Sequence, residues 1–372
     1  MKITKLETIL LAIPNRQDIA DSSQDAAVIK VHTDEGIVGI GQADTNPQVV
    51  KGIMGAEFSH KDSWGMNDIL IGENPLDIER LMRKIYVKAN HYGRRGALLQ
   101  VMSGIEVALW DILGKSVNLP IYRLLGGAFR NKVAAYASCL FPPASDKVIE
   151  NAGEFVEKGF RGIKFGWGVF GGQSFEKDMK MVESIRKGIG DREMMIDAGE
   201  SMDTATAIRY AHALADYDVY WFEDPLHPDN LRGYERLVNA ASIRIAAGEG
   251  ETSVYPYLDL IERVHLDVVQ ADAGRVGGIS VMMKIAQLAY LNGVQFVPHC
   301  WNTDIVLAAT LHVLAAMPQD SWIEYAISES PLRNELCHPH FEIDSEGCIS
   351  IPEAPGLGIE LNEDVIKKYR IA

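Results

Sequence analysis

Cysteine is scarce in this chain, which has four cysteines among 372 residues and no Cys-x-x-Cys pair. The four are Cys139, Cys300, Cys337 and Cys348, which are too few and too scattered for a disulfide scaffold. Cys337 lies near His338 and His340 in a pattern that resembles metal ligands, but no fourth ligand has suitable spacing. We therefore expect a loop cluster without a metal there, and a reduced, cytoplasmic protein.

Positive charge is also in short supply, with 36 Lys and Arg against 51 Asp and Glu, a net charge of −15. This balance argues against nucleic acid or an anionic membrane surface as a partner. It would also repel an anionic substrate at long range, so such a substrate needs a local metal or cationic group.

The N-terminus lacks a long apolar run. Its longest is Ile9 to Ile13, which Pro14 ends. This run is too short for a signal h-region or a membrane span. The overall composition, with 47% hydrophobic and 23% charged residues, is that of a soluble globular protein with a sizeable core.

The first third of the chain reads as an α+β domain, residues 1–125. Residues 1–13 alternate as a strand does, and two further strand patterns are joined by the hairpin signal Asp34-Glu35-Gly36. A helical pattern then runs over 76–117, with a helix at 98–113 that is apolar on most faces and therefore buried.

From 126 to 340 the texture changes to eight short apolar runs that alternate with helical segments such as 204–215 and 279–291. No hairpin signal joins the runs, which favours parallel strands and a (β/α) TIM-type barrel. The tail 341–372 leaves this pattern, and we expect it to return to the N-terminal domain. The eight runs read VAAYAS, RGIKFG, EMMIDAG, DVYWFED, IRIAAGE, LDVVQAD, VQFVPH and SWIEYA.

Three of these runs end in acids at even spacing. Asp197, Glu223 and Glu249 follow one another at intervals of 26 residues (197 to 223 to 249), about one βα unit. A single acid at a strand end is more often a helix cap or a surface charge, but three in register favour a site at one mouth of the barrel. Three carboxylates without Cys or His suit a hard cation, Mg²⁺ or Mn²⁺.

Other strand ends add acid–base groups. Asp272 precedes His299 by one βα unit, so the carboxylate could fix the imidazole tautomer and tune His299 as a general base and then a general acid. A structural histidine is the alternative for His299 alone. Lys164 closes another run, and Glu324 is either a protonated hydrogen-bond donor or an ordinary strand-end acid. Together they fit removal of a proton α to a metal-bound carboxylate.

These residues resemble the enolase superfamily, in its mandelate racemase subgroup, over nearly the whole chain. The matching segments are TDEGIVGIGQA, SGIEVALWDILGKSVNLPIYRLLGG, IDAGES, WFEDP, AAGE, QADAGRVGG and VPHCW. The resemblance implies a capping α+β domain over a modified (β/α) barrel and one Mg²⁺ at Asp197, Glu223 and Glu249. It also implies a His299–Asp272 dyad, a carboxyl donor at Glu324, and a homo-oligomer.

One departure from the family pattern bears on the reaction. The racemase has a Lys-x-Lys strand end whose second lysine is the base on the opposite face, whereas this chain reads Lys164-Phe165-Gly166. Lys164 keeps the first position, whose role is electrostatic contact near the substrate carboxylate. A one-base route therefore leads, in which His299 removes the α-proton and helps the β-hydroxyl leave as water, and Trp167 partly fills the vacated space.

The resemblance also implies that capping loops 14–25 and 45–60 form a lid that selects the substrate. Further expected substrate contacts lie in lid segments or beside His299, although each alone is more often structural. They are Arg16, His32, Tyr92, Arg94 and Trp301. Arg275 follows Asp272 by three residues and is expected to orient Asp272 or Glu249 from behind.

The leading hypothesis is therefore a Mg²⁺-dependent dehydratase of a small sugar acid, an aldonate or aldarate, that yields a 2-keto-3-deoxy acid. One rival is a racemase or epimerase of a 2-hydroxy acid, for which Lys164 is the visible second base. The other is a metal-binding barrel without turnover. The sequence does not identify the sugar acid.

Overall fold

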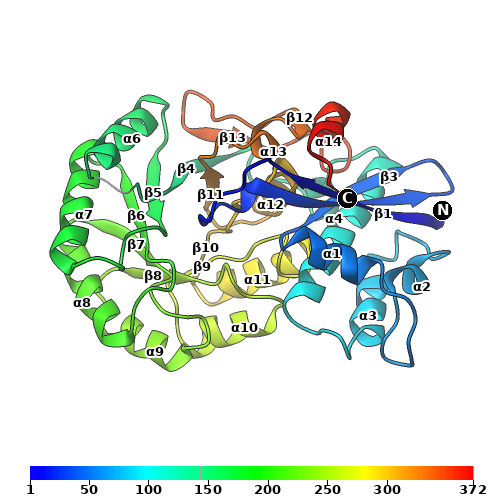
Figure 1. Ribbon diagram of the computed structural model, residues 1–372, viewed down its shortest axis with the longest axis horizontal. Coiled ribbons are helices and arrows are strands. Elements are labelled where there is room, and N and C mark those ends of the chain that lie inside the picture. Colours follow the sequence, from blue (N-terminus) through cyan, green and yellow to red (C-terminus); the bar gives the residue numbers. More distant parts are fainter. Residues whose placement is uncertain (143–144, 372) are drawn as a thin grey trace.

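The computed structural model describes residues 1–142 and 145–371, with side chains for all of these but 145 and 146. Figure 1 shows a small antiparallel sheet and its helices beside a larger parallel sheet that curls and carries helices on its outer side. The two parts meet along the buried helices α4 and α12, whose bounds are given below.

The N-terminal sheet contains the three strands expected from the sequence. They are β1 (Ile3–Ala12), β2 (Asp25–Thr33) and β3 (Val38–Ala43), antiparallel in the order β1-β2-β3. The β2–β3 turn contains Gly36 at φ 79°, a left-handed conformation that glycine adopts without a steric penalty. The hairpin prediction is confirmed.

The helices of this part include two short ones within 45–75, a stretch that the sequence left unassigned. The longest helix, α4, is long and apolar enough to span a membrane by length and composition, but 78% of its most apolar window is buried inside the protein. It packs on β3 and β2 as the expected core helix. The helical elements are η1 (Ser22–Gln24), α1 (Pro47–Met54), α2 (Met66–Leu70), α3 (Ile78–Lys88), α4 (Ala97–Val117) and α5 (Ile121–Leu124).

The parallel sheet contains all eight expected strands in the order β10-β9-β8-β7-β6-β5-β4-β11. Every neighbouring pair is parallel, so the absence of hairpin signals was informative. No ladder joins β10 to β11 among the described residues, which leaves the curled sheet open at one seam. The strands are β4 (Lys132–Leu140), β5 (Gly162–Gly166), β6 (Glu193–Asp197), β7 (Val219–Glu223), β8 (Arg244–Ala247), β9 (Val268–Val269), β10 (Gln295–Phe296) and β11 (Trp322–Ala326).

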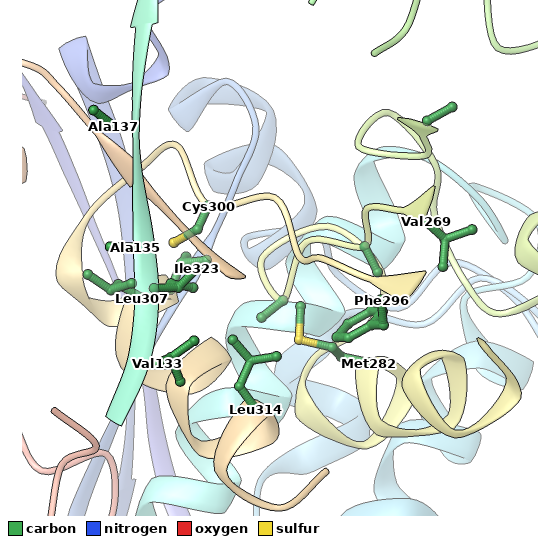
Figure 2. Packing of buried hydrophobic residues seen from close by; sticks show 14 of the residues in the cluster. Val133, Ala135, Ala137, Val269, Met282, Phe296, Cys300, Leu307, Leu314 and Ile323 are labelled. Carbon is green, nitrogen blue, oxygen red and sulfur yellow. The ribbon is translucent and has the colours of Figure 1, made fainter. Parts of the chain in front are cut away.

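Helices alternate with these strands and cover the outer side of the sheet (Figure 1). All described residues of α12 are buried, and it contacts both β3 and β4. Figure 2 shows Leu307 and Leu314 of α12 beside Val133 and Ala135 of β4. The helices are α6 (Ser145–Glu157), α7 (Phe175–Ile189), α8 (Thr204–Ala215), α9 (Leu231–Ala240), α10 (Tyr255–Leu258), the short π-helix η2 (Asp259–Arg263), α11 (Ile279–Leu291), α12 (Asp304–Ala315) and α13 (Pro331–Asn334).

A separate apolar cluster lies within the sheet and sets the position of the site. It includes Met195 and Trp221, which lie two residues before Asp197 and Glu223. Side chains two residues apart on a strand share a face, so the acids follow the apolar cluster on the same inner side. The cluster consists of Tyr136, Met195, Trp221, Ala246, Val268 and Val297.

The tail contacts both parts of the molecule. β13 (Cys348–Ser350) pairs with β4, and β12 (Cys337–His338) pairs with β14 (Glu360–Leu361). α14 (Glu363–Tyr369) packs near β1, where the Ile371 amide donates to the Leu10 carbonyl at 2.9 Å. The domain boundaries at 125 and 340 stay predictions.

Candidate active site

A cavity of about 460 Å³ lies where the parallel strands end. Both parts of the chain contribute to its wall, because a segment between β1 and β2 reaches over the strand ends. The lining residues are Ile19, Ala20, Asp21, Ser22, Leu140, Lys164, Trp167, Asp197, Glu200, Glu249, Gly250, Arg275, His299, Trp301 and Glu324.

The three evenly spaced acids converge at this cavity. Asp197 and Glu223 end β6 and β7, Glu249 follows β8, and one carboxylate oxygen from each lies within 4.8 Å of the other two. The Gly199 amide donates to Asp197 at 2.8 Å, and the Trp221 indole donates to Glu223 at 2.7 Å. Burial and then the neighbouring Glu223 raise the pKa of Asp197. A buried, oxygen-only donor set of this charge fits a hard divalent cation.

Lys164 places its ammonium among these acids. Its Nζ pairs with Glu223, lies 2.9 Å from Glu324 Oε1 and 3.9 Å from Asp197 Oδ2, and the side chain is 2% exposed. Burial lowers the pKa of Lys164, but the Glu223 and Glu324 carboxylates outweigh burial and raise it well above its ordinary value. Lys164 is therefore a fixed cation and not a neutral base.

The sequence left two states open for Glu324, a protonated donor or an ordinary strand-end acid. Its Oε2 accepts the Cys300 amide at 2.7 Å, while Oε1 faces Lys164. Burial raises the pKa of Glu324, but Lys164 and His299 lower it more, to about 2. These contacts favour the ionised carboxylate of the two alternatives, and the role of Glu324 as a donor stays a prediction.

The imidazole and acid expected to pair do so. His299 Nδ1 lies 2.6 Å from Asp272 Oδ2, and the Gly274 amide donates to the other Asp272 oxygen at 2.6 Å. His299 Nε2 lies 3.5 Å from Glu249 Oε2 and 3.9 Å from Glu324 Oε2. Burial lowers the pKa of His299, but the neighbouring carboxylates, Glu249 first, raise it to about 9. The dyad thus directs Nε2 toward the acid cluster.

The vacated lysine position has no space for a side chain. A Cβ at Gly166 would lie 2.5 Å from Asp197 Oδ2 and 2.9 Å from Asp197 Cβ. The next residue, Trp167, lines the cavity at φ 53°, and its ring lies so close to Gly199 that a Cβ there would meet it at 2.8 Å. Trp167 therefore occupies the wall beside the missing lysine, as the sequence suggested.

Arg275 supports the site from behind Glu249. Its Nη1 donates to the Glu249 carbonyl at 2.9 Å and lies 3.7 Å from Glu249 Oε1. Its Nε donates to Asp44, at the end of β3. Arg275 thus links the acid cluster to the N-terminal part. Its guanidinium contacts Glu249, whereas its backbone amide donates to the Asp272 carbonyl at 3.0 Å.

Of the further expected contacts, only Trp301 lines the cavity. Arg16 pairs with Asp25 at 3.1 Å, Tyr92 donates to the Trp64 carbonyl at 2.6 Å, and His32 lies 3.1 Å from Glu7. Arg94 is likewise absent from the described lining. These residues were selected because of the segments in which they lie. Arg16, Tyr92 and His32 instead contact residues outside the cavity lining.

Within the two segments expected to form the lid, residues 19–22 line the cavity and Thr45 and Asn46 line a neighbouring one, and the lid itself stays a prediction. Sequence reasoning missed Asp21 and Ser22 within that lid. Asp21 accepts from the Trp301 indole at 3.1 Å, and the Ser22 hydroxyl donates to the Trp301 carbonyl. The polar Asp-Ser-Ser run was a signal for a capping turn, but not for a contact 280 residues away.

The Cys337, His338 and His340 group has other contacts. Cys337 is buried in β12, and His340 Nδ1 lies 2.6 Å from Asp304 Oδ2. All four cysteines are free. Among the described residues, the group that could hold a metal is Asp197, Glu223 and Glu249.

Comparison with known families decides the identity. Residues 147–365 match the Enolase C-terminal domain-like family, and residues 13–126 match the N-terminal domain of the Mandelate racemase / muconate lactonizing enzyme family. The chain belongs to the mandelate racemase / muconate lactonizing enzyme family of the enolase superfamily.

Members of this family resemble the chain over nearly its whole length. A D-galactarolactone cycloisomerase from Agrobacterium fabrum is 33% identical, over 100% of this chain and 99% of its own. An arabinonate dehydratase from Saccharolobus solfataricus is 30% identical, over 95% of this chain and 92% of its own. The crystal structure of a 3,6-anhydro-D-galactonate cycloisomerase from Zobellia galactanivorans superposes with a TM-score of 0.89 at 30% identity, covering 100% of both chains.

These relatives confirm the resemblance, the fold class and the assignment to enzymes of the carbon–oxygen lyase type. Both cycloisomerases and dehydratases occur among them, so the relatives leave the reaction and the substrate of this chain open.

Proposed function

We propose that the protein is a Mg²⁺-dependent dehydratase of a sugar acid, with one Mg²⁺ per subunit. The observation that carries the proposal is the geometry of the dyad, with His299 Nδ1 held by Asp272 at 2.6 Å and Nε2 3.5 Å from Glu249. This arrangement sets a base beside a metal-binding carboxylate cluster. Two relatives at 30% identity support the reaction type, an arabinonate dehydratase and a D-xylonate dehydratase from Haloferax volcanii.

The residues that would hold the cation are Asp197, Glu223 and Glu249. When bound, a divalent cation neutralises the substrate carboxylate and so stabilises the second negative charge that forms when the α-proton leaves. Lys164 adds a fixed positive charge at the same end of the cavity. Burial of these groups strengthens their electrostatic effect, because water does not screen them.

His299 moves the proton. Its Nε2 accepts the α-proton as the C–H bond breaks, and the electron pair enters the conjugated carboxylate. Asp272 holds the ring in position and stabilises the imidazolium that forms. The imidazolium then returns the proton to the β-hydroxyl, whose C–O bond breaks to release water, and the resulting enol becomes a 2-keto acid.

The racemase alternative lacks a second base. Such a reaction needs a group opposite His299, but Gly166 leaves no space for a side chain and Lys164 is held by Glu223 and Glu324. The barrel without turnover is disfavoured by the complete set of acids, dyad and cation.

A cycloisomerase is the second candidate. The relative at 33% identity is a D-galactarolactone cycloisomerase, and the Zobellia galactanivorans structure is also a cycloisomerase. Dehydration and cycloisomerisation both remove an α-proton and break a C–O bond at the β-carbon. In the cycloisomerase reaction the leaving oxygen stays attached to the product through the rest of the molecule. The same His299 would serve either reaction, so the substrate decides between them.

The proposal is tested with purified protein, Mg²⁺ and a panel of sugar acids and their lactones. We expect a 2-keto product, detected as its semicarbazone, and solvent exchange of the α-proton in D₂O detected by NMR. The variant His299→Asn should lose activity by about 10²–10⁴-fold, because it removes the base.

The matched control is His340→Asn, which removes another histidine held 2.6 Å from an aspartate but outside the cavity lining. This variant should keep full activity. Unchanged turnover in His299→Asn would refute the base assignment. Exchange accompanied by inversion at the α-carbon would refute dehydration and favour the racemase. The cytoplasmic location and the homo-oligomer stay predictions.

A further inference from the structure

Beyond the acid cluster, the dyad, Lys164, Glu324 and Arg275, the cavity wall has few charged groups. We call this part the remaining lining. Its described members are apolar, hydroxyl-bearing or acidic, and none is a cation. They are Ile19, Ala20, Asp21, Ser22, Leu140, Trp167, Glu200, Gly250 and Trp301.

The cavity's two cations, Lys164 and Arg275, both have carboxylate partners already. Lys164 pairs with Glu223 and lies 2.9 Å from Glu324, within the reacting end. Arg275 pairs with Asp44 and donates to the Glu249 carbonyl. Among the described lining residues, no cation is left over for a second anionic group of a ligand.

The remaining lining also carries negative charge. Asp21 is fixed by donors from the protein, the Ser23 amide at 2.9 Å, the Trp301 indole at 3.1 Å and the Ser328 hydroxyl at 3.2 Å. Glu200 lies three residues beyond Asp197 and lines the same cavity. The oxygens of a carboxyl side chain accept hydrogen bonds, so both acids suit hydroxyl groups of a ligand.

We infer that the substrate is a sugar acid with a single carboxylate and an uncharged, hydroxyl-bearing remainder, a conclusion that rests on the proposed α-proton chemistry. The carboxylate takes the end of the cavity where Lys164 and the acid cluster lie, which is the only cationic end among the described lining residues. A dianionic aldarate would bring its second carboxylate into a partly buried wall without a free cation and beside Asp21 or Glu200. Aldonates, anhydroaldonates and monolactones of diacids carry one carboxylate and belong to the inferred class.

The inference is tested by comparing matched pairs of substrates with the Mg²⁺-loaded enzyme. Each pair is an aldonate and the aldarate of the same configuration, together with the aldarate's monolactone. We expect kcat/KM for the best monoanion to exceed that for its dianionic counterpart by at least 100-fold. The double variant Asp21→Asn, Glu200→Gln should lower this ratio at least 10-fold by raising kcat/KM for the diacid, because it removes the repelling charges.

The control is Asp18→Asn, which removes one negative charge from the same loop outside the cavity lining and should leave the ratio unchanged. Diacids turned over as well as, or better than, their monoanionic counterparts would overturn the inference and leave the proposed function standing. An unchanged ratio in the double variant would also overturn it. Absence of turnover and of α-proton exchange with every acid would overturn the proposed function, and this inference with it.

Discussion

At the scale of a single residue, Gly166 affects both the type of reaction and the metal site. Its hydrogen faces Asp197, and a Cβ would lie 2.5 Å from Asp197 Oδ2. The glycine therefore does more than omit a lysine, because any side chain would displace a carboxylate of the acid cluster.

The variant Gly166→Ala should therefore weaken Mg²⁺ binding by about 10-fold or more, the loss typical when the support of a metal ligand is disturbed. Isothermal titration of the purified protein with Mg²⁺ measures the affinity. Gly172→Ala, in the loop that follows β5, is the control, since a Cβ there meets only the Val169 carbonyl at 3.6 Å. Equal affinities for the two variants would contradict the argument.

The residues of the site were accessible from sequence to different degrees. Asp197, Glu223 and Glu249 were predicted because a βα unit has a nearly constant length and brings strand ends together. The state of Glu324 was not, since it depends on a lysine on β5 and a backbone amide after β10. Arg16 lies in a segment that lines the cavity but pairs with Asp25, and Tyr92 donates to the Trp64 carbonyl.

At the scale of elements, α11 shows why the segment QADAGRVGG ends in glycines. Glu106 of α4 accepts the amides of Ile279 at 2.7 Å and Ser280 at 2.9 Å, so it caps the first turn of α11. Gly278 permits this approach, because a Cβ at that residue would lie 2.0 Å from Glu106 Oε2. The cap connects the N-terminal part to the barrel.

The variant Gly278→Ala should lower the free energy of unfolding by about 2–5 kcal/mol, since it combines a left-handed φ of 92° with a steric clash. Gly293→Ala, at the other end of α11, has φ 71° but nothing within 4 Å, so it isolates the backbone penalty of about 1–2 kcal/mol. Urea denaturation followed by circular dichroism measures both. A smaller loss for Gly278→Ala than for Gly293→Ala would refute the role of the Glu106 contact.

Elements were predicted well where periodicity was long and poorly where it was short. α8 and α11 have the predicted bounds, and α4 extends the predicted buried helix. α1 and α2 were missed because they have only eight and five residues, and α1 includes Gly52. The lid contact between Asp21 and Trp301 could not be predicted, because it depends on how the two parts pack.

At the scale of the whole molecule, His312 joins three distant segments. It lies on α12, accepts the Tyr122 amide of α5 at Nδ1 and lies 3.2 Å from the Leu357 carbonyl of the tail. Burial lowers the pKa of His312 to about 4. The neutral ring is therefore required in the folded protein.

This pKa lies below the value of about 6.5 for an unfolded histidine, so the unfolded state binds the extra proton first. Stability should therefore be complete above pH 6.5 and fall by about 3 kcal/mol as pH decreases to 4. Relative to His312→Gln, the wild type should show this loss in urea unfolding across that range. The same substitution at the exposed His212 reports any general effect, and parallel curves for wild type and His312→Gln would contradict the prediction.

The tail has a consequence for synthesis on the ribosome. β1 is made before the other strands of both sheets, yet the amide that meets its Leu10 carbonyl belongs to Ile371, and β4 acquires β13 only when residues 348–350 have been made. At about 5–20 residues per second, Ile371 follows Leu10 by roughly 20–70 s. For that interval the nascent chain exposes unpaired strand edges, which are sites of aggregation, so the synthesis of residues 348–371 closes these edges and their removal would leave β1 open.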